Sequence, residues 1–132
     1  MEAMWGHFLT KIVLVMMGGG LGSLSRYGIT LLSVKLFGFR FPWGTLIVNL
    51  TGCFLIGLSF ALAERSSLMN PTVRLFFVTG FLGGLTTFST YGYESFNAIY
   101  MGNQWIAIGN VVFNNVAGLI LVYLGFRLGN IS

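Results

Sequence analysis

Four long apolar stretches, separated by short polar connections, leave this chain few ways to fold. A helix needs about 20 mostly apolar residues to cross the roughly 30 Å hydrocarbon layer of a bilayer. Only helices and closed barrels satisfy their backbone hydrogen bonds in lipid, and these continuous apolar runs lack the alternation of barrel strands. The sequence therefore predicts an all-α integral membrane protein, one domain over residues 1–132, with spans at about 12–34, 43–63, 72–100 and 105–126.

The composition supports a membrane protein and argues against several other classes. The chain is 55% hydrophobic and only 8% charged, whereas a soluble domain has about 25% charged residues. One Cys and one His cannot build a zinc site, which needs about four N or S ligands. Three acidic residues are too few for the usual carboxylate chemistry of a hydrolase. The seven Lys and Arg are scattered near span ends, so we expect neither an enzyme nor a nucleic-acid-binding protein.

The distribution of basic residues bears on orientation in the membrane, which follows Lys/Arg asymmetry. Four spans put both termini and the loop between the second and third spans on one side. That side carries Lys11, Arg65, Arg74 and Arg127, and the other side carries Lys35 and Arg40. This weak bias leaves two alternatives open: one orientation with a modest preference, or insertion both ways with the two orientations paired as an antiparallel dimer.

Polar residues inside membrane spans are candidate functional residues. In this chain they are Arg26, Asn49, Thr51, Glu94, Asn114, Asn115, and the run Thr86, Thr87, Ser89 and Thr90. Ordinary hydrogen bonds between helices, worth about 0.6 kcal/mol each, are the alternative explanation. Amides, hydroxyls and a guanidinium all donate hydrogen bonds, and Glu94 is the one clearly intramembrane acid. This balance favours a path for an anion over a path for a cation.

The third span, which includes the segment VTGFLGGLTTFSTYGYES, carries the densest polar signal. Gly83-Gly84 followed by Thr86-Thr87 is poor helix-forming sequence. A continuous helix over residues 72–100 would be about 43 Å long, too long to cross the membrane without a tilt or a break. The sequence therefore predicts a broken third helix, whose freed backbone carbonyls are tolerated only inside protein or along a cavity.

Two aromatic residues follow the predicted break. Phe88 and Tyr91 are three residues apart and so share one helix face. Aromatic rings have positive edges, which can face a small anion together with Asn, Ser or Thr donors. Aromatic residues at this spacing also occur as ordinary packing, and both interpretations remain open from the spacing alone.

The segment GFLGGLTTFSTYGYE closely resembles the signature of the CrcB/Fluc fluoride-channel family, GF-x-GG-x-TTFSTF followed by Glu. WGTLIVNLTGCFLIG in the second span resembles that family's GTL-x-VN-x-x-G, and GGGLGSLSRYG in the first resembles its G-x-x-G-x-x-x-RY/W element. The fourth span matches more loosely, by an Asn before a small-residue helix. The resemblance implies a fluoride-selective passive channel in the cell (inner) membrane, which exports cytoplasmic fluoride and so protects against its toxicity. It further implies an antiparallel, dual-topology homodimer with a central structural sodium ion.

The resemblance also assigns residues to sites. It implies a fluoride pathway formed by Arg26, Asn49, Phe88, Tyr91, Glu94 and Asn114, to which we add Ser89 and Thr90 from the polar run of the third span. It also implies a sodium site formed by the main-chain oxygens of Gly83 and Thr86 in both subunits. Tyr91 stands where the family usually has Phe. Its hydroxyl is expected either to act as an extra donor or to bond a neighbour such as Glu94, and restoring Phe is expected to leave flux near normal.

Two rival functions remain from sequence. A small dual-topology multidrug transporter would need a membrane-embedded Glu in its first span, where this chain has Arg26. A non-transporting membrane assembly subunit predicts no ion flux from the purified protein alone.

Overall fold

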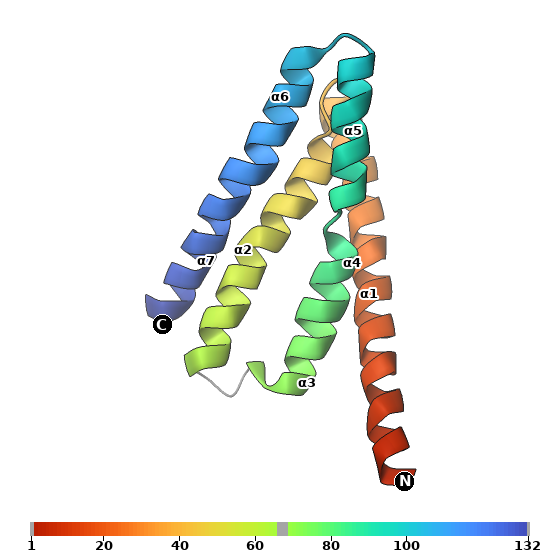
Figure 1. The fold of residues 1–132 in the computed structure, drawn as a ribbon, viewed down its shortest axis with the longest axis vertical. Helices are drawn as coiled ribbons and strands as arrows, with labels where there is room; N and C mark the ends of the chain where they lie inside the picture. Colours follow the sequence, from red (N-terminus) through yellow and green to blue (C-terminus); the bar gives the residue numbers. More distant parts are fainter. Residues whose placement is uncertain (1, 66–68, 132) are drawn as a thin grey trace.

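The computed structural model of this protein describes residues 2–65 and 69–131. Within these ranges the chain is helical almost throughout and has no strand, and the helices form an elongated bundle (Figure 1). The elements are α1 (Glu2–Phe37), α2 (Trp43–Arg65), α3 (Pro71–Arg74), η2 (Leu75–Leu82), α4 (Gly83–Leu85), α5 (Phe88–Tyr100), α6 (Gln104–Val112), η3 (Phe113–Ala117) and α7 (Gly118–Ile131), where η marks π-helical turns.

Four helical stretches of the described chain are long and apolar enough to cross a membrane. They are His7–Phe37, Trp43–Arg65, Pro71–Tyr100 and Gln104–Ile131, and each contains one of the spans expected from sequence. The prediction of an all-α protein with four membrane-crossing helices is confirmed.

The third span is broken where the sequence predicts a break. Thr86 (φ −81°, ψ 156°) and Thr87 (φ −150°, ψ 116°) have extended backbones that interrupt the helix between α4 and α5. The Thr87 hydroxyl oxygen accepts the N–H of Thr90 and so caps the start of α5. Figure 1 shows the break as a short kinked connection at mid-height in the bundle.

Two π-helical segments interrupt the spans, and sequence did not predict them. η2 directly precedes the break in the third span, and η3 interrupts the fourth span at Asn114 and Asn115. Such segments widen the helical turn locally and are frequent at functional sites. Both π-helical segments contribute residues to the candidate site described below.

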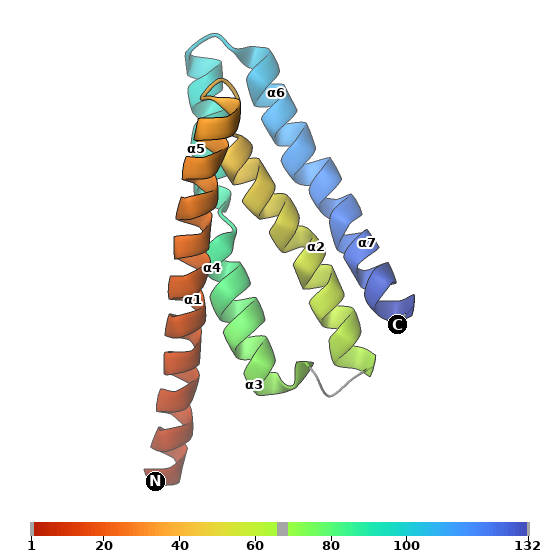
Figure 2. The ribbon, with the colours of Figure 1, turned by 180° about the vertical axis from the view of Figure 1, so that it is seen from behind.

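Glycines allow close contacts between helices. A Cβ on Gly18 or Gly22 of α1 would collide with the backbone of the third span, and one on Gly57 or Gly125 would do the same between α2 and α7. Small residues permit this approach, which replaces the hydrophobic driving force that is absent in lipid. As a result α1 lies along η2 and α4, while α2 lies beside α7 (Figures 1 and 2).

The loop from α1 to α2 and the turn from α5 to α6 lie at the same end of the bundle, the top of Figures 1 and 2. Gly38 (φ +75°) follows α1, and Gly102 (φ +76°) follows α5. This left-handed conformation is accessible to glycine without strain and ends helices. Residues of both chain reversals line a cavity that is described below with the candidate site.

Candidate functional site

The side chain of Asn49, in α2, holds the broken backbone of the third span. Its Oδ1 accepts the N–H of Thr87 at 2.8 Å, and its Nδ2 donates to the carbonyl of Thr87 at 3.2 Å. In a continuous α-helix the N–H of Thr87 would bond the carbonyl of Gly83. The Asn49 amide therefore replaces a helical partner and fixes the break to α2.

A chain of hydrogen bonds runs from Asn49 into the fourth span and back to α5. Asn49 Nδ2 donates to Asn114 Oδ1, and Asn114 Nδ2 donates to both Asn110 Oδ1 and the Asn110 carbonyl, all at 2.9 Å. Asn110 Nδ2 donates to Ser95 Oγ at 2.9 Å, and Ser95 donates to the Tyr91 carbonyl at 2.8 Å. Asn110 is only 1% exposed, so this network lies inside the bundle.

A groove of about 360 Å³ opens beside this network. Six of the site residues assigned by the family resemblance line it, namely Asn49, Gly83, Thr86, Phe88, Tyr91 and Asn114. Phe88 is 82% exposed in the single chain, so its ring forms a wall of the groove and contributes little to the packing of the chain. The Phe88 and Tyr91 rings meet edge-on, with centroids 5.4 Å apart and planes at 63°.

One of the two alternatives from sequence was a bond between the Tyr91 hydroxyl and Glu94. The structure shows a different partner. Asn115 Nδ2 donates to Tyr91 Oη at 2.9 Å, and Asn115 also lines the groove. The hydrogen-bond partner of Tyr91 therefore comes from η3 in the fourth span, and not from Glu94 on the same helix.

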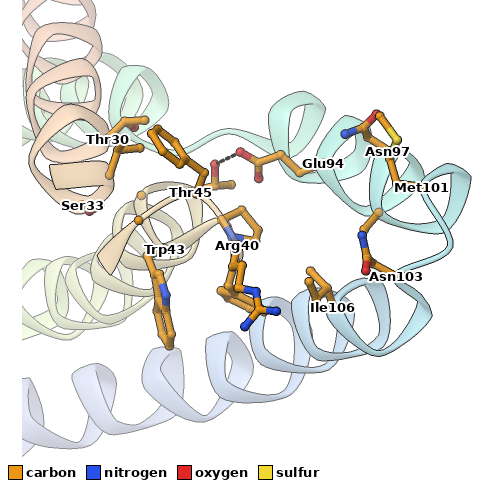
Figure 3. A pocket seen from close by; sticks show the side chains of 17 residues that line it. Thr30, Ser33, Arg40, Trp43, Thr45, Glu94, Asn97, Met101, Asn103 and Ile106 are labelled. Atoms are coloured by element: carbon orange, nitrogen blue, oxygen red, sulfur yellow. Dashed lines mark hydrogen bonds between the residues drawn. The ribbon is translucent and has the colours of Figure 1, made fainter. Parts of the chain in front are cut away.

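Glu94 instead lies at a second hollow, a cavity of about 410 Å³ near the α1–α2 loop. Thr45 Oγ1 donates to Glu94 Oε1 at 2.7 Å (Figure 3). The other carboxylate oxygen, Oε2, is buried and receives no hydrogen bond from the described residues. Arg40 and Asn97 also line this cavity. Glu94 is thus separated from the groove, about one helical turn beyond Tyr91.

Three other predicted pathway residues, Arg26, Ser89 and Thr90, contact residues of the helix break. Arg26 Nη1 donates to the Thr86 carbonyl at 3.1 Å, so its guanidinium contacts the interrupted backbone. Thr87 Oγ1 donates to Thr90 Oγ1 at 2.9 Å, and Ser89 Oγ lies 3.4 Å from Thr87 Oγ1. These hydroxyls lie at the start of α5, where Thr87 also lines the groove and Ser89 and Thr90 do not.

The break also releases the two carbonyls that the family resemblance assigns to sodium. The N–H of Thr87 bonds Asn49 instead of the Gly83 carbonyl, and the N–H of Thr90 bonds the Thr87 hydroxyl instead of the Thr86 carbonyl. Carbonyl oxygens suit a hard cation. The bond from Arg26 takes one of the two lone pairs on the Thr86 oxygen, so the other lone pair and the Gly83 oxygen are those left to a cation.

Sequence reasoning missed two residues of these networks, Thr45 and Asn110, and gave no partner for Asn115. Thr45 precedes Asn49 by four residues, and Asn110 precedes Asn114 by four. Residues four apart share one helix face. A search for polar residues one turn before Asn49 and Asn114 would therefore have found Thr45 and Asn110. Asn115 was recognised as polar, but its role depends on contact with Tyr91.

Comparisons with known proteins agree with these features. The family model described as "CrcB-like protein, Camphor Resistance (CrcB)" matches residues 13–126. The "Fluoride-specific ion channel FluC" of Chloroflexus aurantiacus is 46% identical over 121 residues, 92% of this chain and 96% of the relative. Proteins with the same name from Salinibacter ruber (44% over 117 residues; 89% and 87%) and Dehalococcoides mccartyi (41% over 121 residues; 92% and 93%) are also similar. The similarity therefore extends over all four spans.

Proposed function

This chain belongs to the CrcB family, and on that premise we propose that it is a fluoride-selective, passive ion channel and not an enzyme. Four membrane-crossing helices make it a multi-pass membrane protein, and its bacterial relatives support a location in the cell inner membrane. Its role is then to let cytoplasmic fluoride leave the cell and so to protect against fluoride toxicity. The rival multidrug transporter has no support from these relatives.

The observation that carries this proposal is the groove at the break, which is lined both by side-chain amides and by the aromatic pair Phe88 and Tyr91. A fluoride ion leaving water needs replacement for its hydration shell, and that replacement must be weak enough for the ion to leave again. Positive ring edges from Phe88 and Tyr91 supply part of it. The start of α5 lies at the groove, so the positive end of its helix dipole adds a field that favours an anion.

Asn49 contributes to conduction by exchanging partners. Both of its Nδ2 hydrogens are already bonded, one to the Thr87 carbonyl and one to Asn114 Oδ1. We expect fluoride to take the place of Asn114 Oδ1, and the original bond to form again when the ion moves on. This exchange keeps the net binding energy modest because one hydrogen bond replaces another.

A homodimer is part of the proposal, because the groove is open on one side and Phe88 is exposed there. A second copy that covers this face would enclose the ion path. The weak Lys/Arg asymmetry supports an antiparallel pair with dual topology. Reporters fused to the C-terminus are expected to show both orientations in cells, and a single orientation at native expression would contradict this part.

A structural sodium ion between two subunits is also proposed, held by the carbonyl oxygens of Gly83 and Thr86. Its support is the release of both carbonyls by the break. Replacing sodium by N-methyl-D-glucamine during unfolding should lower the stability of the dimer, because a ligand that binds only the folded state stabilises it. Equal stability in both salts would count against the ion.

The channel function is tested with purified protein in liposomes that contain no other protein. Fluoride efflux above that of empty vesicles is expected, with chloride efflux at the empty-vesicle rate. If the folded protein releases no fluoride, the rival assembly subunit is favoured and the channel is rejected.

A further inference from the structure

Most side-chain donors that line the groove are already used within the protein. The Nδ2 hydrogens of Asn49 go to Thr87 and Asn114, and those of Asn114 both go to Asn110. The hydroxyls at the break are used as well, since Thr86 donates to the Leu82 carbonyl and Thr87 to Thr90. An anion that enters the groove would have to break these bonds to obtain their hydrogens.

The Tyr91 hydroxyl differs from these groups. Its oxygen accepts from Asn115 Nδ2 at 2.9 Å, whereas no residue in the ranges 2–65 and 69–131 accepts its hydrogen. The other Nδ2 hydrogen of Asn115 goes to the Val111 carbonyl at 2.8 Å. Among the oxygen- and nitrogen-bound side-chain hydrogens of the described groove, the Tyr91 hydrogen is the one without an acceptor.

The bond from Asn115 determines how that hydrogen can be used. A hydroxyl donates one hydrogen and accepts through its lone pairs, so a donor held at the Tyr91 oxygen keeps the hydroxyl hydrogen away from Asn115. Hydrogen bonds in series also polarise one another, so donation from Asn115 strengthens the Tyr91 O–H as a donor. Both Tyr91 and Asn115 line the groove.

We propose that the Tyr91 hydroxyl donates a hydrogen bond to fluoride in the groove, and that Asn115 is the positioning residue that prepares this hydroxyl. The proposal rests on the channel function given above. Hydrogen bonds from O–H to an anion are short and about twice as strong as neutral ones. In this chain the second aromatic position thus offers the ion a hydroxyl and not only a ring edge. Sequence resemblance alone gives the opposite expectation, that Tyr91→Phe leaves flux near normal.

Fluoride efflux per folded protein in liposomes separates the two expectations. Tyr91→Phe keeps the ring and removes the hydroxyl, and loss of a hydrogen bond to a charged group predicts about a tenfold fall in flux. Tyr93→Phe is the matched control, because it removes the same hydroxyl from an exposed residue of α5 that does not line the groove. Its flux should equal that of the wild type.

The role of Asn115 is tested by substitution in two backgrounds. Asn115→Leu should lower flux about threefold when Tyr91 is present, and should have no further effect in the Tyr91→Phe background, since there is no hydroxyl to position. An equal loss in both backgrounds would show that Asn115 acts only structurally and would overturn its positioning role. Wild-type flux in Tyr91→Phe would overturn the inference but leave the channel intact, whereas a wild-type protein without fluoride flux would reject both.

Discussion

The groove at the helix break and the cavity around Glu94 share two helices, α2 and α5, yet they present opposite chemistry. α2 contributes Asn49 to the groove and Thr45 to the cavity, and α5 contributes Tyr91 and Glu94. The groove holds a hydroxyl hydrogen without an acceptor, whereas the cavity holds a carboxylate oxygen to which no described residue donates. About one helical turn of α5 therefore separates the Tyr91 hydroxyl, which can donate to an anion, from the Glu94 carboxylate, which can only accept hydrogen bonds.

This difference suggests a division of roles along the ion path. The cavity, about 410 Å³ in volume, has room for on the order of ten waters at roughly 30 Å³ each, so an ion there can keep its hydration shell. In the proposed channel, the groove supplies ring edges and hydrogen-bond donors where that shell has to be replaced. Substitutions in the groove should therefore reduce flux more than substitutions in the cavity.

The largest effect is expected for Asn49→Asp. A carboxylate still accepts from Thr87 N–H but can no longer donate to the Thr87 carbonyl or to Asn114, and it adds a negative charge to the groove. Two lost bonds of about 1–2 kcal/mol each predict a loss of fluoride flux between about 30-fold and 1000-fold. Liposome efflux per folded protein measures it.

Asn130→Asp is the control for that substitution. It makes the same chemical change near the end of α7, where the amide donates to the Phe126 carbonyl. Flux should stay at the wild-type level there. If Asn49→Asp folds and conducts like the wild type, the role of Asn49 in the path is refuted.

The next effect concerns the buried hydrogen-bond network beside the groove. Asn110→Leu removes the amide that bonds Ser95 and Asn114, leaving polar groups unpaired inside the bundle. Unpaired buried groups should lower the free energy of unfolding by about 1–3 kcal/mol, and disorder of Asn114 should lower flux per folded protein about tenfold. Unfolding in mixed detergent and liposome efflux give the two values. Unchanged flux per folded protein would separate Asn110 from the ion path.

A smaller effect is expected in the cavity. Thr45→Val removes the hydroxyl that donates to Glu94 Oε1 and leaves that oxygen without its partner. Because the hydrated ion does not depend on this bond, flux should fall only about threefold, even if stability drops by about 1–3 kcal/mol. Thr30→Val is the matched control, since Thr30 lines the same cavity without bonding Glu94 (Figure 3). A loss as large as that of Asn49→Asp would reverse the proposed division of roles.

The smallest effect is expected for Arg40→Gln, which removes an exposed positive charge from the cavity lining. A charge there attracts anions only over the screening length, about 10 Å at 0.1 M salt and about 3 Å at 1 M. Flux should therefore fall about twofold at low ionic strength and be unaffected at high ionic strength. Lys35→Gln, outside the cavity, is the control, and a salt-independent loss would argue against attraction at the cavity.

Much of the fold could be predicted from sequence because lipid permits few alternatives. The four spans follow from length and hydropathy, and the break follows from Gly83-Gly84 beside Thr86-Thr87. The π-helical segments η2 and η3 were not predictable. Both lie in mostly apolar sequence that gives no local signal for a widened turn.

The site was predicted less completely, for a related reason. Residue types and the family motif identified Asn49, Phe88 and Tyr91, which the structure brings to one groove. Hydrogen-bond partners depend on which helices face each other, so the bond from Asn115 to Tyr91 and the buried position of Asn110 became evident only in three dimensions. Roles along the ion path remain predictions for all of them.

The most direct test of the fluoride path compares two Phe-to-Ile substitutions on α5. Phe88 forms a wall of the groove, whereas Phe96 is also exposed, at 64%, but stacks on Tyr100 away from it. Both variants lose an aromatic ring and keep apolar volume, so differences in packing largely cancel. Fluoride efflux per folded protein should fall severely in Phe88→Ile and stay at the wild-type rate in Phe96→Ile. Equal flux in Phe88→Ile, Phe96→Ile and the wild type would contradict conduction through this groove.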